Sequence, residues 1–281
     1  MKWISCLLLQ EDEDGQIDIS FGLFYKGSHI PALQVENHMI AEKEQERYRR
    51  QILVDDIGIE GQEKLQRSSI LISGAGGLGS PISYYLAAAG VGNLRIVDHD
   101  EVSLSNLNRQ ILYLDRDIGR KKASAAQEKM QELNPSINIE GVVGTITEDN
   151  VIKLLHDCDI ILDALDNFPT RYLLNQAALN MNIPYIYGGI YGLEGALTTM
   201  IPGETACLRC IFPVAPPSTI TPVLGTTSGI IGCLQAMEAI KLIVGIGKLL
   251  TNRLMVFDGI NMKFREVKLN RNTQCQSCST I

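Results

Sequence analysis

The chain has 281 residues, of which 45% are hydrophobic and 20% are charged, a composition typical of a globular protein with a sizeable core. Its formal net charge of -7 argues against general binding to nucleic acid or anionic membranes, because both favour a basic surface. The length fits one large α/β domain or two smaller ones. The longest apolar segment, residues 230–246, contains Glu238 and Lys241, which favours a buried helix over a membrane span.

Residues 1–40 read as an N-terminal extension to a main domain of residues 41–281. Two strand-like stretches, 3–9 and 17–25, flank an acidic turn with Gly15, which predicts a β-hairpin before Pro31. The favoured interpretation is a pair of strands that covers one edge of the main domain, and the alternative is a docking element for a peptide or partner. The opening MKWISCLLL is too short for a secretory signal, so we expect a cytoplasmic protein.

A charged helix is predicted over residues 42–51. It carries Arg47, Arg49 and Arg50, and a run of charges is usually a solvated face. The alternative is an arginine clamp for phosphate, because a guanidinium matches phosphate oxygens with two parallel hydrogen bonds.

The central pattern is strand, glycine loop, helix and strand over residues 68–100. The apolar run 70–72 precedes four glycines between Gly74 and Gly79, residues 82–89 have helical spacing, and the run 94–97 ends on Asp98. Free N–H groups at such a helix start favour a phosphate, and Asp98 can accept hydrogen bonds from a ribose. A tight turn in an ordinary α/β domain remains the alternative.

Strands and helices then alternate, which predicts an α/β fold with a mostly parallel, Rossmann-like sheet covered by helices on both faces. After Gly188 the pattern changes to a C-terminal antiparallel extension that contains one long helix. The expected helices are 119–133, 148–156, 170–181 and 230–244, and the expected strands are 137–143, 159–163, 183–187, 194–201, 253–257 and 263–269.

Four of the seven cysteines form two C-x-x-C pairs, Cys207 with Cys210 and Cys275 with Cys278. Four thiolates suit a closed tetrahedral zinc site, and no ligand position is left open for chemistry. The site would therefore be structural and would attach the C-terminal tail to the domain. The alternative is four unrelated buried or redox cysteines.

Polar residues cluster after the predicted strands. Carboxylates with arginine, lysine and asparagine suit a nucleoside triphosphate with Mg²⁺, whereas a dinucleotide needs fewer cations. The chain has no G-x-x-x-x-G-K-[ST] loop, so it is not a P-loop enzyme. Taken singly, each of these residues fits a surface or structural role as well. They are Asp98, Asp100, Asn106, Arg109, Lys122, Asp166, Asn167 and Arg171.

In this combination the chain resembles the MoeB/ThiF/HesA adenylyltransferases, which are relatives of ubiquitin-activating enzymes. Within that family it is most similar to the enzymes that activate the sulfur-carrier subunit of molybdopterin synthase. The matching motifs lie in the family's order between residues 47 and 278: Arg47-Tyr48-x-Arg50-Gln51, Gly74-x-Gly76-Gly77-Leu78-Gly79, Asp98-x-Asp100, Ser105-Asn106-Leu107-x-Arg109-Gln110, Gly119-x-x-Lys122-Ala123, Asp166-Asn167-x-x-x-Arg171, Cys207-x-Arg209-Cys210, Met237-Glu238-Ala239-Ile240-Lys241 and the last C-x-x-C.

The resemblance implies a homodimer that adenylates the C-terminal glycine of a ubiquitin-like sulfur carrier with Mg·ATP. By resemblance, Asp98 holds the ribose, Arg109 and Lys122 hold phosphates, and Asp166 orients Mg²⁺. Arg50 would reach the phosphates of the other subunit. The full set of expected nucleotide contacts is Gly77, Asp98, Asp100, Ser105, Asn106, Arg109, Lys122, Asp166 and Asn167.

The chain departs from the family pattern in two places. The loop 211–229 has no cysteine, and Cys233 falls inside an apolar helix, so we expect no covalent link between enzyme and carrier. The 40-residue extension is absent from the simplest relatives and leaves a peptide-adenylating enzyme of natural-product biosynthesis as an alternative. An NAD-dependent dehydrogenase and a non-catalytic nucleotide-binding scaffold are further alternatives from other classes.

Overall fold

Two antiparallel strands, β1 (Cys6–Glu11) and β2 (Ile17–Gly22), lie in the first of two units, Met1–His38 and Met39–Ile281. The computed structural model describes residues 6–11, 17–22, 40–217 and 222–279. The predicted acidic turn, Pro31 and the outer ends of the predicted hairpin strands lie outside the described residues. The division of the chain at residue 40 into extension and catalytic domain stays a prediction.

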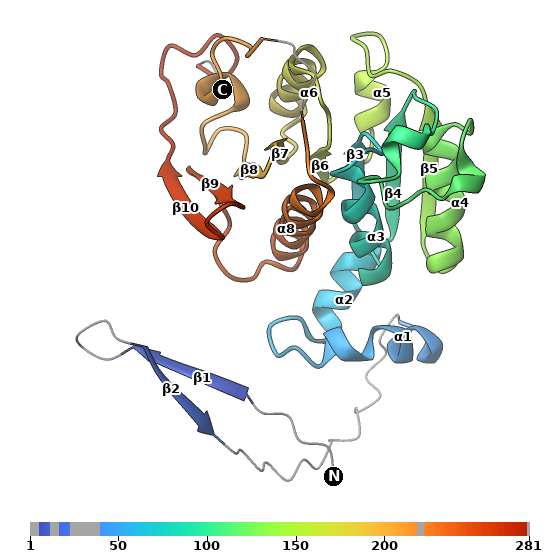
Figure 1. The fold of residues 1–281 in the computed structure, drawn as a ribbon, viewed down its shortest axis with the longest axis vertical. Coiled ribbons are helices and arrows are strands. Elements are labelled where there is room, and N and C mark those ends of the chain that lie inside the picture. The colour runs from blue at the N-terminus through green and yellow to red at the C-terminus, as the bar shows by residue number, and fades with distance from the viewer. Residues whose placement is uncertain (1–5, 12–16, 23–39, 218–221, 280–281) are drawn as a thin grey trace. The chain divides into compact units, whose positions relative to one another are not determined.

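The second unit is built on an eight-stranded sheet in the order β10-β9-β8-β7-β6-β3-β4-β5 (Figure 1). Strands β3 to β7 pair in parallel, and β8, β9 and β10 continue the sheet in antiparallel fashion. This confirms the predicted fold class. The strands are β3 (Ser69–Ser73), β4 (Asn93–Asp98), β5 (Asn138–Val143), β6 (Ile160–Asp163), β7 (Tyr185–Tyr191), β8 (Glu194–Met200), β9 (Arg253–Asp258) and β10 (Lys263–Lys268).

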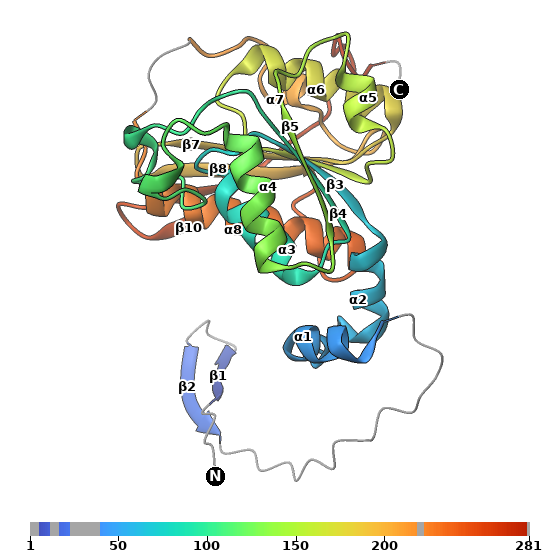
Figure 2. The ribbon, with the colours of Figure 1, turned by 90° about the vertical axis from the view of Figure 1, so that its right-hand side faces the viewer.

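Helices cover both faces of the sheet (Figure 2). Because side chains alternate along a strand, Ile70 and Ile72 of β3 pack with the helices α3, α4 and α8, whereas Leu71 packs with α5 and α6 on the opposite face. The helices are α1 (Glu42–Ile52), α2 (Gly58–Arg67), α3 (Gly79–Ala89), α4 (Lys122–Leu133), α5 (Val151–Leu155), α6 (Phe168–Met181), α7 (Leu208–Ile211) and α8 (Gly225–Val244).

Helix α8 is long and apolar enough to cross a membrane, but half of its apolar window is buried, and it packs on α3, β7 and β8. It begins at Gly225 rather than at the predicted Ile230. Its first turn is made of small polar residues, which carry no apolar periodicity, yet Thr227 and Ser228 are buried. Strand β7 likewise continues past the predicted end at Tyr187, because Gly188 and Gly189 pair with β8 instead of ending the strand.

Candidate functional site

The glycine loop after β3 is the centre of the site. The Gly74 N–H donates to the Val97 carbonyl at 2.8 Å, and Gly74 has a φ of +109°, where a side chain would be strained. The loop then folds back on itself so closely that a Cβ at Gly79 would lie 2.0 Å from the Gly74 carbonyl oxygen. Only glycine allows this close approach, which brings the N-terminus of α3 to the carboxyl edge of the sheet.

Asp98, the last residue of β4, joins two parts of this edge. Its carboxylate accepts hydrogen bonds from the Ala75 N–H and from the Asp100 N–H, both at 2.8 Å. Asp98 is half-buried, so one side of the group faces the surface. A carboxylate at the end of the second strand is where dinucleotide-binding folds hold a ribose, so Asp98 stays the candidate for that contact.

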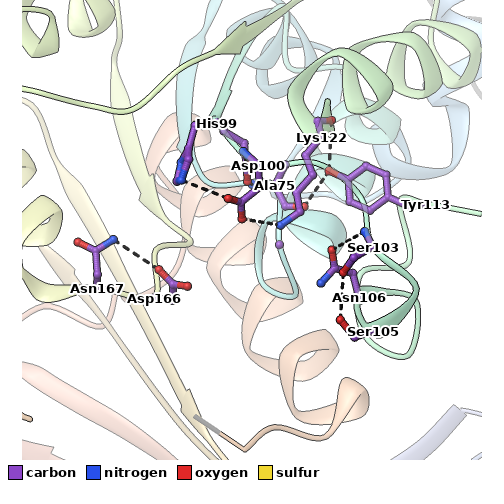
Figure 3. Close-up of polar contacts among 12 residues, drawn as sticks. Ala75, His99, Asp100, Ser103, Ser105, Asn106, Tyr113, Lys122, Asp166 and Asn167 are labelled. Atoms are coloured by element: carbon purple, nitrogen blue, oxygen red, sulfur yellow. Dashed lines mark hydrogen bonds and ion pairs between the residues drawn. The ribbon is translucent and has the colours of Figure 1, made fainter. Parts of the chain in front are cut away.

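Lys122 and Asp100 form an ion pair beside the glycine loop (Figure 3). The Lys122 ammonium, on a residue only 5% exposed, donates to Asp100 at 2.8 Å. Burial alone would raise the pKa of Asp100, but Lys122, with smaller contributions from His99 and Lys121, lowers it below the ordinary value. The Tyr113 hydroxyl, 2.9 Å from the Ala75 carbonyl and 3.2 Å from the Lys122 carbonyl, joins the loop to the start of α4.

A tight polar turn at residues 103–109 forms one side of the site. The Ser103 N–H donates to the Asn106 side-chain oxygen at 3.0 Å, and the Ser103 and Ser105 hydroxyls are 3.0 Å apart. Arg109 donates to the Ser105 carbonyl at 2.8 Å and to the Asn108 side chain at 3.1 Å. The turn therefore presents hydroxyl, amide and guanidinium groups together.

Asp166 and Asn167 lie across from that turn, after β6, with the Asp100–Lys122 pair between them (Figure 3). Both residues are exposed. The Asn167 side-chain oxygen caps α6 by accepting the Thr170 N–H at 3.0 Å, and its amide donates to Asp166 at 3.4 Å. The structure thus brings the predicted nucleotide-binding residues of one chain to a single edge of the sheet.

Arg171 differs from Arg109 and Lys122 because its guanidinium is bonded to the end of β6, the loop after it and β7, and this corrects its assignment as a candidate triphosphate contact. It is 6% exposed and pairs with buried Asp163 at 3.1 Å. Arginine at helical spacing from Asn167 looks like a surface residue in sequence, but the helix turns its guanidinium under the loop.

Arg50 is also separate from the other predicted residues. Helix α1 contacts the C-terminal ends of α3 and α4: Gln51 donates to the Ala89 carbonyl, and Asn134 donates to the Tyr48 hydroxyl, both at 2.8 Å. Those helix ends lie at the amino edge of the sheet, about 17 Å from the carboxyl edge by strand length. Arg50 is exposed there, at the edge of the sheet opposite to the glycine loop.

Ser228 and Tyr113 are site-forming residues that sequence reasoning missed. A Cβ at Gly77 would lie 2.9 Å from the Ser228 hydroxyl oxygen, so the first turn of α8 lies against the glycine loop. The Thr-Thr-Ser start of this helix carries no motif, and only the close glycine contact identifies it.

The four paired cysteines meet in space, as the two C-x-x-C pairs predict. Sulfur–sulfur distances are 3.6 Å for Cys207 and Cys275, 3.5 Å for Cys210 and Cys278, and 3.9 Å for Cys207 and Cys210. Four sulfurs each about 2.3 Å from one ion would lie about 3.8 Å apart, so the cluster is compatible with tetrahedral zinc. Burial opposes the Cys275 thiolate, yet nearby backbone N–H groups lower its pKa to about 7.

Comparison with known proteins agrees with this geometry. The sequence profile of the ThiF family matches residues 48–277. The chain is 41% identical over 248 residues to a sulfur carrier protein adenylyltransferase of Thermus thermophilus, covering 84% of this chain and 92% of that protein. It is 45% identical over 240 residues to an adenylyltransferase and sulfurtransferase MOCS3 of Culex quinquefasciatus, covering 83% of this chain. Because the match covers 55% of that protein, the chain spans about half its length.

A solved structure of MccB from E. coli with MccA-N7isoASN superposes with a TM-score of 0.76, over 86% of this chain and 76% of that one. The identity is 22%, so this similarity shows a shared fold. The family match covers most of the chain, and both sequence relatives carry adenylyltransferase in their names. The chain therefore belongs to the ThiF family and is an adenylyltransferase.

Proposed function

We propose that this enzyme adenylates the C-terminal glycine of a ubiquitin-like sulfur-carrier protein. A carboxylate oxygen of that glycine attacks the α-phosphorus of ATP, and the bond from that phosphorus to the oxygen bridging to the β-phosphorus breaks. Pyrophosphate leaves, and the carrier keeps AMP on its C-terminal carboxyl group. The observation that carries the proposal is the 41% identity to a sulfur carrier protein adenylyltransferase over 92% of that relative.

The proposed roles are those implied by the family resemblance, and the positions of the side chains support them. The Gly77 loop and the start of α3 supply N–H groups to phosphate, Asp98 binds the ribose, and the cations Arg109 and Lys122 neutralise phosphate charge. Asp166 would hold Mg²⁺ through a carboxylate oxygen, and the ion would shield charge that develops on the phosphates. The remaining proposed nucleotide contacts are Asp100, Ser105, Asn106 and Asn167.

We also propose a homodimer in which Arg50 of each subunit completes the site of the other. The position of α1 at the opposite edge of its own sheet supports this arrangement. Zinc in the cluster of Cys207, Cys210, Cys275 and Cys278 would attach the C-terminal tail to α7 and have no part in the reaction.

No covalent step with the enzyme is proposed. Loop 211–229 contains no cysteine, and burial raises the pKa of the Cys233 thiol, which disfavours its nucleophilic thiolate. The acyl adenylate would be released or passed to a separate sulfur donor. The similarity to MccB supports the peptide alternative only at the level of fold.

The experiment is ATP–pyrophosphate exchange with candidate acceptors. We expect exchange with a carrier protein that ends in Gly-Gly, and none with the same carrier lacking both terminal glycines. Exchange with a short precursor peptide but with no carrier would favour the peptide alternative. Binding of ATP without exchange with any acceptor would favour a scaffold.

A further inference from the structure

A buried guanidinium lies beneath the loop that carries Asp166 and Asn167. We propose that Arg171, held by Asp163 and supported by Gln235, is a positioning residue that fixes where Asp166 presents its carboxylate to Mg·ATP. This inference rests on the proposed function, because it takes Asp166 as the group that meets the metal nucleotide.

The guanidinium of Arg171 joins three segments. One nitrogen, Nη2, donates to the Leu165 carbonyl at 2.5 Å and to the Gly188 carbonyl at 2.9 Å. Another, Nε, pairs with the Asp163 carboxylate at 3.1 Å. The end of β6, the loop after it and the middle of β7 are thereby fixed to one planar group.

Aromatic rings complete the binding site of this guanidinium. The carbon Cζ of Arg171 lies 5.2 Å from the ring centre of Phe168 and 5.0 Å from that of Tyr187. Burial disfavours the charge, but Asp163, with smaller contributions from Tyr187 and Tyr185, raises the pKa of Arg171. The group therefore stays charged, and desolvation strengthens its attraction to the rings and to Asp163.

Gln235 connects the same point to α8. Its amide donates to the Asp163 carbonyl at 2.8 Å and to the Ile186 carbonyl at 3.2 Å. A Cβ at Gly188 would lie 2.2 Å from the Gln235 side-chain oxygen, so this approach requires glycine. Both the main chain and the side chain of Asp163 are held in place.

These contacts affect the position of Asp166 through its neighbour, Leu165. Leu165 is bonded on both sides, because its N–H donates to the Asp163 carboxylate at 3.0 Å and its carbonyl accepts from Arg171. The exposed Asp166 carboxylate accepts a long hydrogen bond of 3.4 Å from Asn167. Its position is therefore set mainly by the backbone of the loop, which the buried guanidinium holds.

The test removes the Arg171 guanidinium by substitution and then supplies a guanidinium from solution. Arg171→Ala should leave a cavity lined by two carbonyls, a carboxylate and two rings. Methylguanidinium can restore the planar set of N–H donors there, whereas the smaller methylammonium restores only the charge. The matched control is Arg95→Ala, because Arg95 also pairs with a carboxylate, Glu140, at 2.6 Å and donates to the Leu154 and His156 carbonyls, away from the site. If Arg171→Ala does not fold, the same measurements are made on Arg171→Lys.

Two readouts are measured against Mg²⁺ concentration: the ATP–pyrophosphate exchange rate and the affinity for a non-hydrolysable ATP analogue. In Arg171→Ala we expect kcat for exchange to fall about 10²-fold, since misplacement of a reacting group by about 1 Å has that effect. We also expect a higher Mg²⁺ requirement for nucleotide binding. Millimolar methylguanidinium should reverse both changes, and methylammonium neither. Arg95→Ala should lose thermal stability but keep the wild-type exchange rate and Mg²⁺ dependence.

The inference is overturned if Arg171→Ala is less stable but keeps the wild-type kcat and Mg²⁺ dependence, or if methylguanidinium has no effect on either. Failure of the proposed function looks different: the wild-type enzyme would then show no exchange with any carrier. The nucleotide-affinity readout still decides the inference in that case, because it requires no acceptor.

Discussion

At the scale of residues, the site is an arrangement of charges held before any nucleotide arrives. Lys122 is almost fully buried, and its ammonium pairs with the half-exposed carboxylate of Asp100. Asp98 is held by two backbone N–H groups, whereas Asp166 faces the surface. Lys122 and Asp98 are therefore held by protein partners, whereas the exposed Asp166 carboxylate is accessible to an ion.

Asp166→Ala tests the proposed metal contact. We expect ATP–pyrophosphate exchange to be abolished, because the carboxylate that orients Mg²⁺ is lost. The melting temperature should stay near that of wild type, because the side chain is exposed. Near wild-type exchange in this variant would refute the role.

Asp100→Asn tests the ion pair through pH. The folded-state pKa of Asp100 is lowered, so its contribution to stability is present above the ordinary value of 3.8 and is lost as pH falls through the folded-state pKa. At neutral pH the free energy of unfolding of wild type should exceed that of the variant by less than about 1 kcal/mol, because the Asp100 side chain is half-exposed. The difference in unfolding free energy should vanish in acid; a difference that grows on acidification would contradict this.

At the scale of elements, helix α8 joins the sheet to the glycine loop. Buried Glu238 accepts hydrogen bonds from the Thr199 hydroxyl and the Leu250 N–H, both at 2.7 Å, and pairs with Lys241 at 2.6 Å. The motif Met237–Lys241, which in sequence only marks the family, is therefore a structural connection between α8, β8 and the segment before β9.

Glu238→Ala should lower the free energy of unfolding by about 3 kcal/mol, because it leaves a buried donor pair and a lysine without their acceptor. Met237→Ala on the same helix is the control, since Met237 is 55% exposed and should change stability little. Chemical denaturation of both variants measures this. Equal, small effects would show that the buried carboxylate contributes little.

Zinc removal tests the connection between α7 and the C-terminal tail. Purified protein should contain about one zinc per chain, and chelation should lower the melting temperature, because metal binding and folding are coupled. Cys278→Ser should reduce the zinc content, whereas Cys158→Ser, outside the cluster, should not. Elemental analysis that finds no zinc in wild type would refute the site.

Most elements could be predicted from sequence because their signals are local. Alternating strands and helices, the glycine loop and the cysteine pairs all depend on spacing within a few residues. The burial of Arg171 could not be predicted, because it depends on Asp163, Phe168 and Tyr187 meeting in space. The first turn of α8 was missed for a similar reason: Ser228 is polar, and only packing against Gly77 buries it.

At the scale of the whole molecule, the sheet places Arg50 and the proposed nucleotide-binding edge at opposite ends of the parallel strands. No sequence pattern shows this separation, since it follows from strand order and direction. A second copy of the chain is the proposed source of the missing arginine, because a two-fold dimer would supply both sites alike.

Mixing inactive subunits tests this arrangement. Arg50→Ala and Asp166→Ala should each be inactive as homodimers. A subunit-exchanged equal mixture should regain about a quarter of wild-type activity, because half of the dimers then contain one complete site. Exchange assays measure the regained activity, and size-exclusion chromatography measures the oligomeric state. A monomer in solution, or a mixture as inactive as its parents, would contradict the shared site.

Adenylation of the carrier is measured most directly by the intact mass of a carrier protein ending in Gly-Gly after incubation with this enzyme and Mg·ATP. We expect a gain equal to one adenylyl group on the carrier, released again on adding excess pyrophosphate, and no gain when the carrier lacks both terminal glycines. An unchanged carrier mass while ATP is bound and intact would contradict it.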